Sequence, residues 1–244
     1  MYRLPKLGLE KGLIHGFSSV SEGNMSFLWG DEDDVLRNRK GFLGQLNVDS
    51  EKCAVMSIFD DNRIALIESG TKVGIGKDNR IPSDALVTDQ RNIFLFLLIA
   101  DCLPVILYEP KSEILALVHC GWRSTDAGLL EKVIGFLKER FSVAPGGLIV
   151  GIGPGIHKES YKYTDPPQKR LPGWKDFLAD LPDGRTAIDI IGYGKRQLIE
   201  AGVKEENIEI SDIDTAADST FFSHYRSKKT GEAEGRFAAV VGMV

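Results

Sequence analysis

A thiol and an imidazole stand near the ends of two apolar segments of the chain. Cys102 lies just beyond the apolar run 93–100, and His119 closes the run 114–119. Glu109–Glu113 suits a hairpin turn between the segments that carry them. Pairing outward from that turn places Cys102 opposite His119 or Cys120, to within one residue, with facing Cβ atoms roughly 5 Å apart. We therefore expect Cys102 and His119 to converge at one end of a sheet.

Such a pair can form half of a metal site, or it can act as a nucleophile with its base. The ordinary alternatives are that Cys102 is a small buried apolar residue and that His119 is a core imidazole bonded to a backbone carbonyl. Spacing alone favours neither interpretation. Asp101 precedes the thiol and can orient a partner, although acidic residues at strand ends commonly cap turns.

An aromatic residue and a cation follow within four residues of His119. Trp122 can stack on a base, and Arg123 beside a helix start can hold an anion such as phosphate. In the alternative, Trp122 packs on the core and Arg123 pairs with a surface carboxylate. His15 lies in an apolar strand, where a structural role is the default and a shared pocket is the alternative. The same two alternatives, core packing or substrate lining, apply to His224.

The elements that must position these residues alternate between strand-like and helix-like segments. Both alternate positions of segment 115–118 are apolar, so we expect layers to cover both faces of the sheet there. The pattern predicts one mixed α/β domain over residues 1–244. The expected strands are 12–18, 54–59, 63–67, 85–88, 93–99, 105–108, 114–119, 148–152, 208–210 and 237–241, the expected helices are 33–46, 127–141, 174–181 and 188–201, and 165–172 is expected to be an exposed loop.

Composition narrows the possible partners. With 35 acidic and 30 basic side chains the net charge is -5, which argues against nucleic acid or an anionic membrane and favours small molecules. No apolar run has the length of a bilayer span or the pattern of a secretory signal. Three cysteines without paired spacing suit reduced thiols in a cytoplasm. We therefore expect a cytoplasmic protein.

Three segments resemble successive signatures of a known family. They are Ser-Asp-Ala-Leu-Val-Thr at 83–88, Ala-Asp-Cys-Leu-Pro-Val at 100–105 and Val-His-Cys-Gly-Trp-Arg at 118–123. These look like the YfiH/YlmD family, laccase-domain proteins once called multicopper polyphenol oxidases and later assigned purine nucleoside phosphorylase activity. Similar motifs open and close the match, at 15–18, 38–39, 214–215, 222–223 and 235–236. The resemblance implies a single layered domain of the α/β/β/α type.

The family also implies a zinc ion, held by two histidines and a cysteine at a cleft that binds the nucleoside. Cys102 and His119 occupy two of these ligand positions. The third position falls on Phe59, which cannot bind a metal, so a carboxylate such as Asp60 or Asp61 is the candidate replacement. The family's arginine after the opening His-Gly-Phe is replaced as well, by Ser19 or Val20.

The activity that the resemblance implies is phosphorolysis of adenosine- or inosine-type nucleosides, with a related deaminase activity. Arg123 and Arg39 are the candidates for binding phosphate, and Trp122 and His15 complete the expected substrate site. Cys102, His119 or a zinc-bound water would help the base to leave. Asp101 would stabilise the oxocarbenium-like transition state.

Two other functions compete with this one. Loss of the third ligand suits an eroded member, a nucleoside-binding or regulatory protein that no longer turns over. Copper-dependent oxidation of phenols ranks last, because four scattered histidines cannot build a multicopper centre. The sequence leaves open the base preference and whether the protein is a monomer or a homodimer.

Overall fold

The computed structural model describes all residues from 1 to 244. Its helices are α1 (Glu32–Gln45), α2 (Trp122–Asp126), α3 (Leu129–Phe141), α4 (Ile190–Glu200) and α5 (His224–Thr230). Its strands are β1 (Leu13–Phe17), β2 (Cys53–Ser57), β3 (Ile64–Leu66), β4 (Arg80–Pro82), β5 (Ala85–Thr88), β6 (Phe94–Ile99), β7 (Leu103–Glu109), β8 (Ile114–Cys120), β9 (Ile149–Ile152), β10 (Lys162–Tyr163), β11 (Leu178–Asp180), β12 (Thr186–Ile188), β13 (Ile208–Ile210) and β14 (Phe237–Met243). No helix is long and apolar enough to cross a bilayer.

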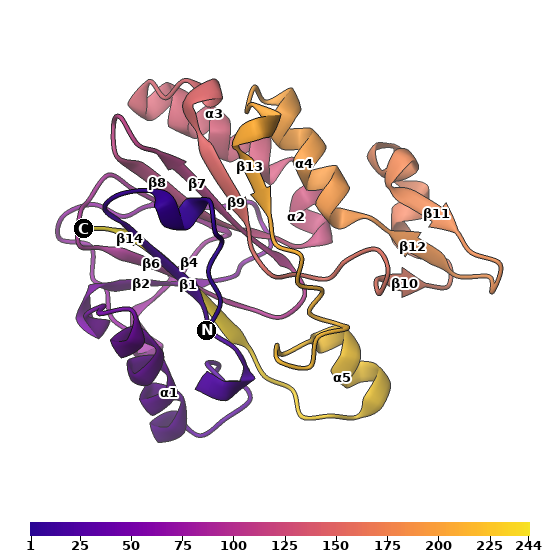
Figure 1. The fold of residues 1–244 in the computed structure, drawn as a ribbon, viewed down its shortest axis with the longest axis horizontal. Coiled ribbons are helices and arrows are strands. Elements are labelled where there is room, and N and C mark those ends of the chain that lie inside the picture. Colours follow the sequence, from indigo (N-terminus) through magenta and orange to yellow (C-terminus); the bar gives the residue numbers. More distant parts are fainter.

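The strands form two large sheets and one small one. The five-stranded sheet has the order β1-β14-β6-β2-β4, the six-stranded sheet β13-β9-β7-β8-β5-β3, and the small sheet β10-β12-β11. Figure 1 shows α1 on the outer side of the five-stranded sheet, and α3 with α4 on the outer side of the six-stranded sheet. The two sheets face each other, so the layers run α/β/β/α, as the family resemblance implied.

Alternation along β6 divides the side chains of the five-stranded sheet between two cores. Phe94 and Phe96 pack with Phe42 of α1, whereas Leu95 and Leu97 belong to the core between the two large sheets. Successive side chains of a strand point to opposite faces, so one apolar run supplies both cores.

The same division along β8 confirms that both faces of segment 115–118 are covered. Leu115 and Leu117 belong to the core between the sheets, and Ala116 and Val118 to the core beneath α3. The strand that carries His119 is therefore held rigidly on both sides.

The β7–β8 hairpin has nearly the predicted register. Leu103 pairs with Cys120, and Pro104 pairs with His119. Cys102 lies one step beyond the last pair, alongside Gly121, which is one residue from the predicted partner and within the stated range. Asp101 turns the chain here, with a φ of 78° in the left-handed region.

Three predicted elements differ from the structure. The predicted helix 127–141 is present as α3 but begins two residues later, at Leu129, because Gly128 adopts a φ of 72° and separates it from α2. Segment 174–181 is not a helix: a 3-10 turn at Pro172–Phe177 leads into β11, since a proline opens the turn and three residues then pair with β12. Segment 165–172 contains the 3-10 turn Pro167–Arg170, whose Gln168 is buried.

Candidate active site

Cys102 and His119 converge above Gly121. A Cβ atom on Gly121 would lie 3.4 Å from Cys102 Sγ and 3.4 Å from His119 Cε1. The hairpin brings the two strand ends together, and the glycine leaves the space between sulfur and imidazole free. The spatial part of the prediction is therefore met: both side chains border one small space.

Two cavities meet at Cys102. The larger has a volume of about 280 Å³ and a mostly apolar lining, and the smaller has a volume of about 200 Å³. Ala100, Cys102 and His224 line both of them. The larger is also lined by Asp101, Trp122, Arg123, Ile156, Tyr161, Tyr163, Ile190 and Tyr225, and the smaller by Ile58, Leu98, Ile99, His119 and Arg236. We call the two together the cleft.

Trp122 and Arg123 lie at the larger cavity, in the short helix α2. The guanidinium carbon of Arg123 lies 4.5 Å from the centre of the Trp122 ring, a cation–π contact. Arg123 is exposed and forms no ion pair with any carboxylate, so the alternative in which it pairs with a surface acid does not occur. Its charge is available to an anion in the cleft.

Asp101 lines the cleft, but its carboxylate is used by the fold. One oxygen accepts a hydrogen bond from Thr215 Oγ1 at 2.7 Å, and the other accepts one from the backbone N–H of Tyr225 at 2.6 Å. Tyr225 lies in the first turn of α5, so Asp101 fixes that helix against the cleft. The expected role of Asp101 in stabilising the transition state stays a prediction.

His224, which sequence analysis left between core packing and substrate lining, lies in the cleft. Its Nδ1 is 2.8 Å from Glu234 Oε1. Burial raises the pKa of Glu234, but hydrogen bonds from Arg236, Ser227 and His224 outweigh it and hold that pKa below its usual range. An ionised carboxylate thus orients the imidazole, as in many sites where a histidine handles protons.

Asp60 lies in the loop between β2 and β3, and this loop places it close to His119. One ring nitrogen of His119 and one carboxylate oxygen each of Asp60 and Asp84 lie within 4.8 Å of one another. His119 is buried, and its ring nitrogens form no hydrogen bond with the protein. An unsatisfied buried imidazole nitrogen costs about 1–3 kcal/mol unless something binds to it.

Burial sets the protonation states in the cleft. It raises the pKa of the Cys102 thiol to about 12, with further contributions from Asp101 and Asp60. It also lowers the pKa of His119, against the opposing effect of the Asp60 and Asp84 carboxylates. At neutral pH the thiol is protonated and the imidazole neutral, so Cys102 is not an activated nucleophile on its own.

These residues fit a metal ion. The orphaned imidazole of His119, the space above Gly121 and the facing sulfur of Cys102 supply nitrogen, room and a soft ligand in one place. A cation would also stabilise the thiolate that burial disfavours. Phe59 contributes nothing here: it is 55% exposed and stacks on Arg63, with 4.5 Å from the guanidinium carbon to the ring centre.

Two predicted substrate residues lie outside the cleft. Arg39 is fully buried in α1, where it donates hydrogen bonds to the backbone oxygens of Met25 and Ile75. His15 is buried in β1, and its Nε2 accepts the backbone N–H of Leu4 at 2.9 Å. Neither side chain lines a cleft cavity, so the predictions that Arg39 holds phosphate and that His15 lines the pocket are wrong.

Comparison with known proteins defines the class. The family model described as multi-copper polyphenol oxidoreductase laccase matches residues 13–244. The chain belongs to this family.

Particular relatives agree with that assignment and with the predicted YfiH/YlmD resemblance. Purine nucleoside phosphorylase YlmD of Geobacillus stearothermophilus is 28% identical over 258 residues, covering 98% of this chain and 91% of the relative. The YlmD protein of Bacillus subtilis, named likewise, is 28% identical over 259 residues, covering 96% and 89%. The crystal structure of YlmD from G. stearothermophilus matches with a TM-score of 0.84 at 26% identity, over 96% of this chain and 93% of that one. The hypothetical protein YfiH of Bacillus licheniformis shares the fold, with a TM-score of 0.85 at 24% identity over 95% and 93%.

Proposed function

We propose that the cleft binds a purine nucleoside and phosphate and cleaves the N-glycosidic bond by phosphorolysis. The observation that carries the proposal is an apolar, aromatic cavity with an unpaired arginine at its edge, which meets the cavity lined by His119 at Cys102. Aromatic planes suit a purine, and a free guanidinium suits a phosphate dianion. Relatives named purine nucleoside phosphorylases support this substrate class.

The reaction exchanges one bond for another at the ribose. A phosphate oxygen bonds to C1′ while the bond from C1′ to N9 breaks and its electron pair passes to the base. The proton of hydrogen phosphate, relayed by water or by a cleft residue, reaches a purine nitrogen. The products are ribose 1-phosphate and the free neutral purine.

Each cleft residue has a separate role in this proposal. Arg123 holds the phosphate, and Trp122 contacts the base together with the tyrosines of the cavity. Without a metal, the neutral imidazole of His119 can accept a proton and then pass it to the leaving purine. With zinc bound, the imidazole would be a ligand and would not transfer protons. Asp101 acts at a distance, by fixing α5 and with it His224.

The cofactor that we propose is zinc, with Cys102 and His119 among its ligands. When bound, it would supply a Lewis acid and an acidic water. A multicopper centre would need more imidazoles than the cleft offers, because only His119 and His224 line it.

A second candidate function is nucleoside binding without turnover. Its specific observation is Phe59, which stands at the family's third ligand position and stacks on Arg63 away from the metal ligands. Ile58 lines the smaller cavity instead. An incomplete metal site of this kind would leave a binding protein with a regulatory role.

Product analysis separates the two functions. We expect inosine or adenosine to yield free purine and ribose 1-phosphate in equal amounts, and only when phosphate is present. Arg123→Met should raise the KM for phosphate at least about tenfold, since a charge-assisted hydrogen bond contributes about 1.5–3 kcal/mol. Arg140→Met, at an exposed site on α3, is the matched control and should leave that KM unchanged.

Other outcomes assign the protein differently. Nucleoside binding by calorimetry without any product supports the eroded member, and ammonia release from adenosine without phosphate supports deamination. We also retain as predictions a cytoplasmic location, a monomer or homodimer, and no nucleic-acid partner.

A further inference from the structure

The loop that carries Asp60 is built around a single carboxylate. Asp84 Oδ1 accepts the backbone N–H groups of Phe59 at 3.0 Å and Asp60 at 2.8 Å. Its Oδ2 accepts those of Asp61 at 3.0 Å and Arg63 at 3.2 Å. Although burial opposes it, these four hydrogen bonds keep the pKa of Asp84 below its usual value. The ionised carboxylate is thereby fully used in shaping the loop.

The same residue ties the loop to the strand that carries His119. The backbone oxygen of Asp84 accepts the backbone N–H of His119 at 2.9 Å. Asp84 therefore fixes the loop and the histidine relative to each other. The main chain of Asp60 turns through a φ of 56°, a left-handed conformation that aspartate tolerates better than most residues.

Asp60 is the free carboxylate of this group. Its side chain forms no hydrogen bond and no ion pair with the protein, whereas Asp61 pairs with Arg63 at 2.9 Å. The ring of His119, buried to more than nine-tenths, likewise has no protein partner. A carboxylate and an imidazole without partners thus lie within 4.8 Å of each other.

Cys102 is the second possible ligand beside the ring of His119. Its sulfur and the ring of His119 border the same space above Gly121. The ring of His119 therefore adjoins the Asp60 carboxylate and borders the same space as the Cys102 sulfur, and the three residues come from separate segments of the chain.

We propose that Asp60 is the third ligand of a zinc site formed with Cys102 and His119, and that Asp84 is the positioning residue that holds it there. One thiolate, one imidazole and one carboxylate are ligands that zinc accepts, and three protein ligands leave the open position of a catalytic site. Asp60 would thus supply the third ligand from the residue after Phe59, which stands at the position that the resemblance assigns to that ligand. This inference rests on the zinc of the proposed function, but it is tested without measuring activity.

Metal affinity tests the proposal on the full-length protein. Metal-free protein is titrated with zinc against a chromophoric chelator, and we expect one zinc per chain. Asp60→Asn should weaken binding by more than about tenfold, since even outer-shell partners of a metal contribute about 10- to 100-fold. Asp61→Asn, one residue along the same loop, is the matched control and should bind zinc as the wild type does.

A second experiment looks for a stronger metal signal in a variant, because a misfolded variant could only lose signal. With cobalt in place of zinc, the wild type should show one thiolate-to-metal absorption band, which Cys102→Ser removes. Asp60→Cys should strengthen that band by adding a second thiolate. X-ray absorption at the zinc edge should correspondingly count one sulfur neighbour in the wild type and two in Asp60→Cys.

Two results would overturn the proposal. Wild-type protein that binds no zinc would remove the site, and an Asp60→Asn variant with wild-type affinity would remove Asp60 from it. Phosphorolysis measured on the same samples is a separate readout. Zinc bound as expected without any phosphorolysis would reject the proposed function and leave the Asp60 site intact.

Discussion

Cys102 reaches the cleft because of the residue before it. Asp101 adopts a left-handed backbone conformation, and its carboxylate accepts hydrogen bonds from Thr215 and from the first turn of α5. The turn directs the thiol out of the β7–β8 ladder, and the hydrogen bonds bring His224 to the same place. The pair Asp101–Cys102 thus combines one positioning side chain with one candidate ligand.

His15 is predicted to make stability depend on pH. Burial lowers its pKa to about 4, with a further contribution from Arg3, and its Nε2 must stay unprotonated to accept the N–H of Leu4. Between pH 6.5 and about 4 the unfolded chain binds the proton and the folded protein does not. The free energy of unfolding therefore falls as pH falls through this range.

The measurement compares urea unfolding of the wild type and His15→Gln from pH 7 to pH 4. The glutamine oxygen can accept the same N–H but does not titrate. We expect the wild type to lose about 2–3 kcal/mol more than the variant over this range. Parallel curves for the two proteins would show that His15 is not the titrating group.

At the scale of elements, α1 is fastened by the arginine that was expected to hold phosphate. Arg39 bonds to two backbone oxygens and lies between rings, with 4.3 Å from its guanidinium carbon to the Phe27 centre and 5.4 Å to that of Phe96. An arginine on the apolar face of a helix can either bind a ligand or donate hydrogen bonds to backbone oxygens. The positions of the Met25 and Ile75 carbonyl groups decide between these two roles, and the sequence does not give those positions.

Arg39→Lys is therefore a stability variant. A single ammonium group cannot replace the planar fork, so we expect the free energy of unfolding to fall by about 1–3 kcal/mol with no change in the KM for phosphate. Arg37→Lys, on the exposed face of the same helix, should change neither quantity. A raised KM for phosphate in Arg39→Lys at unchanged stability would return Arg39 to the site.

The sequence predicts those elements whose residues interact locally or in a regular pattern. The alternation along β6 and β8 and the short turn of the hairpin suffice to bring Cys102 beside His119. The loop 59–63 could not be predicted, because its shape depends on Asp84, more than 20 residues away in the chain. The place of His224 could not be predicted for the same reason: its helix is fixed by Asp101, which is 124 residues from Tyr225.

At the scale of the whole molecule, the cleft lies where the layers end. β8 carries His119 from the six-stranded sheet. Ile99 of β6, in the other sheet, lines the same cavity, as does Arg236, the residue before β14. The core between the sheets includes residues of both. We propose that residues 1–244 form one domain, because strands of both sheets line the smaller cavity of the cleft.

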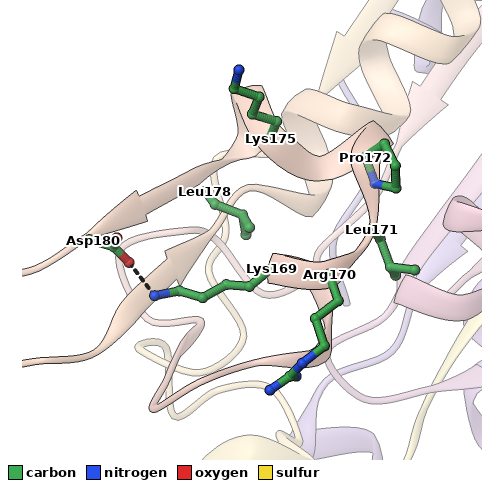
Figure 2. Close-up of a pocket in the computed structure, with 7 residues that line it drawn as sticks. All are labelled: Lys169, Arg170, Leu171, Pro172, Lys175, Leu178 and Asp180. Carbon is green, nitrogen blue, oxygen red and sulfur yellow. Dashed lines mark ion pairs between the residues drawn. The ribbon is translucent and has the colours of Figure 1, made fainter.

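A larger cavity lies elsewhere and has different chemistry. It has a volume of about 500 Å³ and lies beside the small sheet, where Figure 2 shows Lys169, Arg170 and Lys175 around it. Lys169 pairs with Asp180 at 2.7 Å, and the lining contains no aromatic residue, cysteine or histidine. Its positive charges could bind phosphate, but it has no aromatic surface for a purine. It is therefore the site that competes with the cleft for phosphate.

A crystal structure with phosphate and a nucleoside analogue whose carbon–carbon glycosidic bond cannot be cleaved tests the central claim most directly. We predict that the base lies against Trp122 in the cleft cavity of about 280 Å³ and that phosphate lies at Arg123. C1′ should lie between them, on the side of Cys102 and His119. An empty cleft, with phosphate bound at Lys169 and Lys175 instead, would contradict the account.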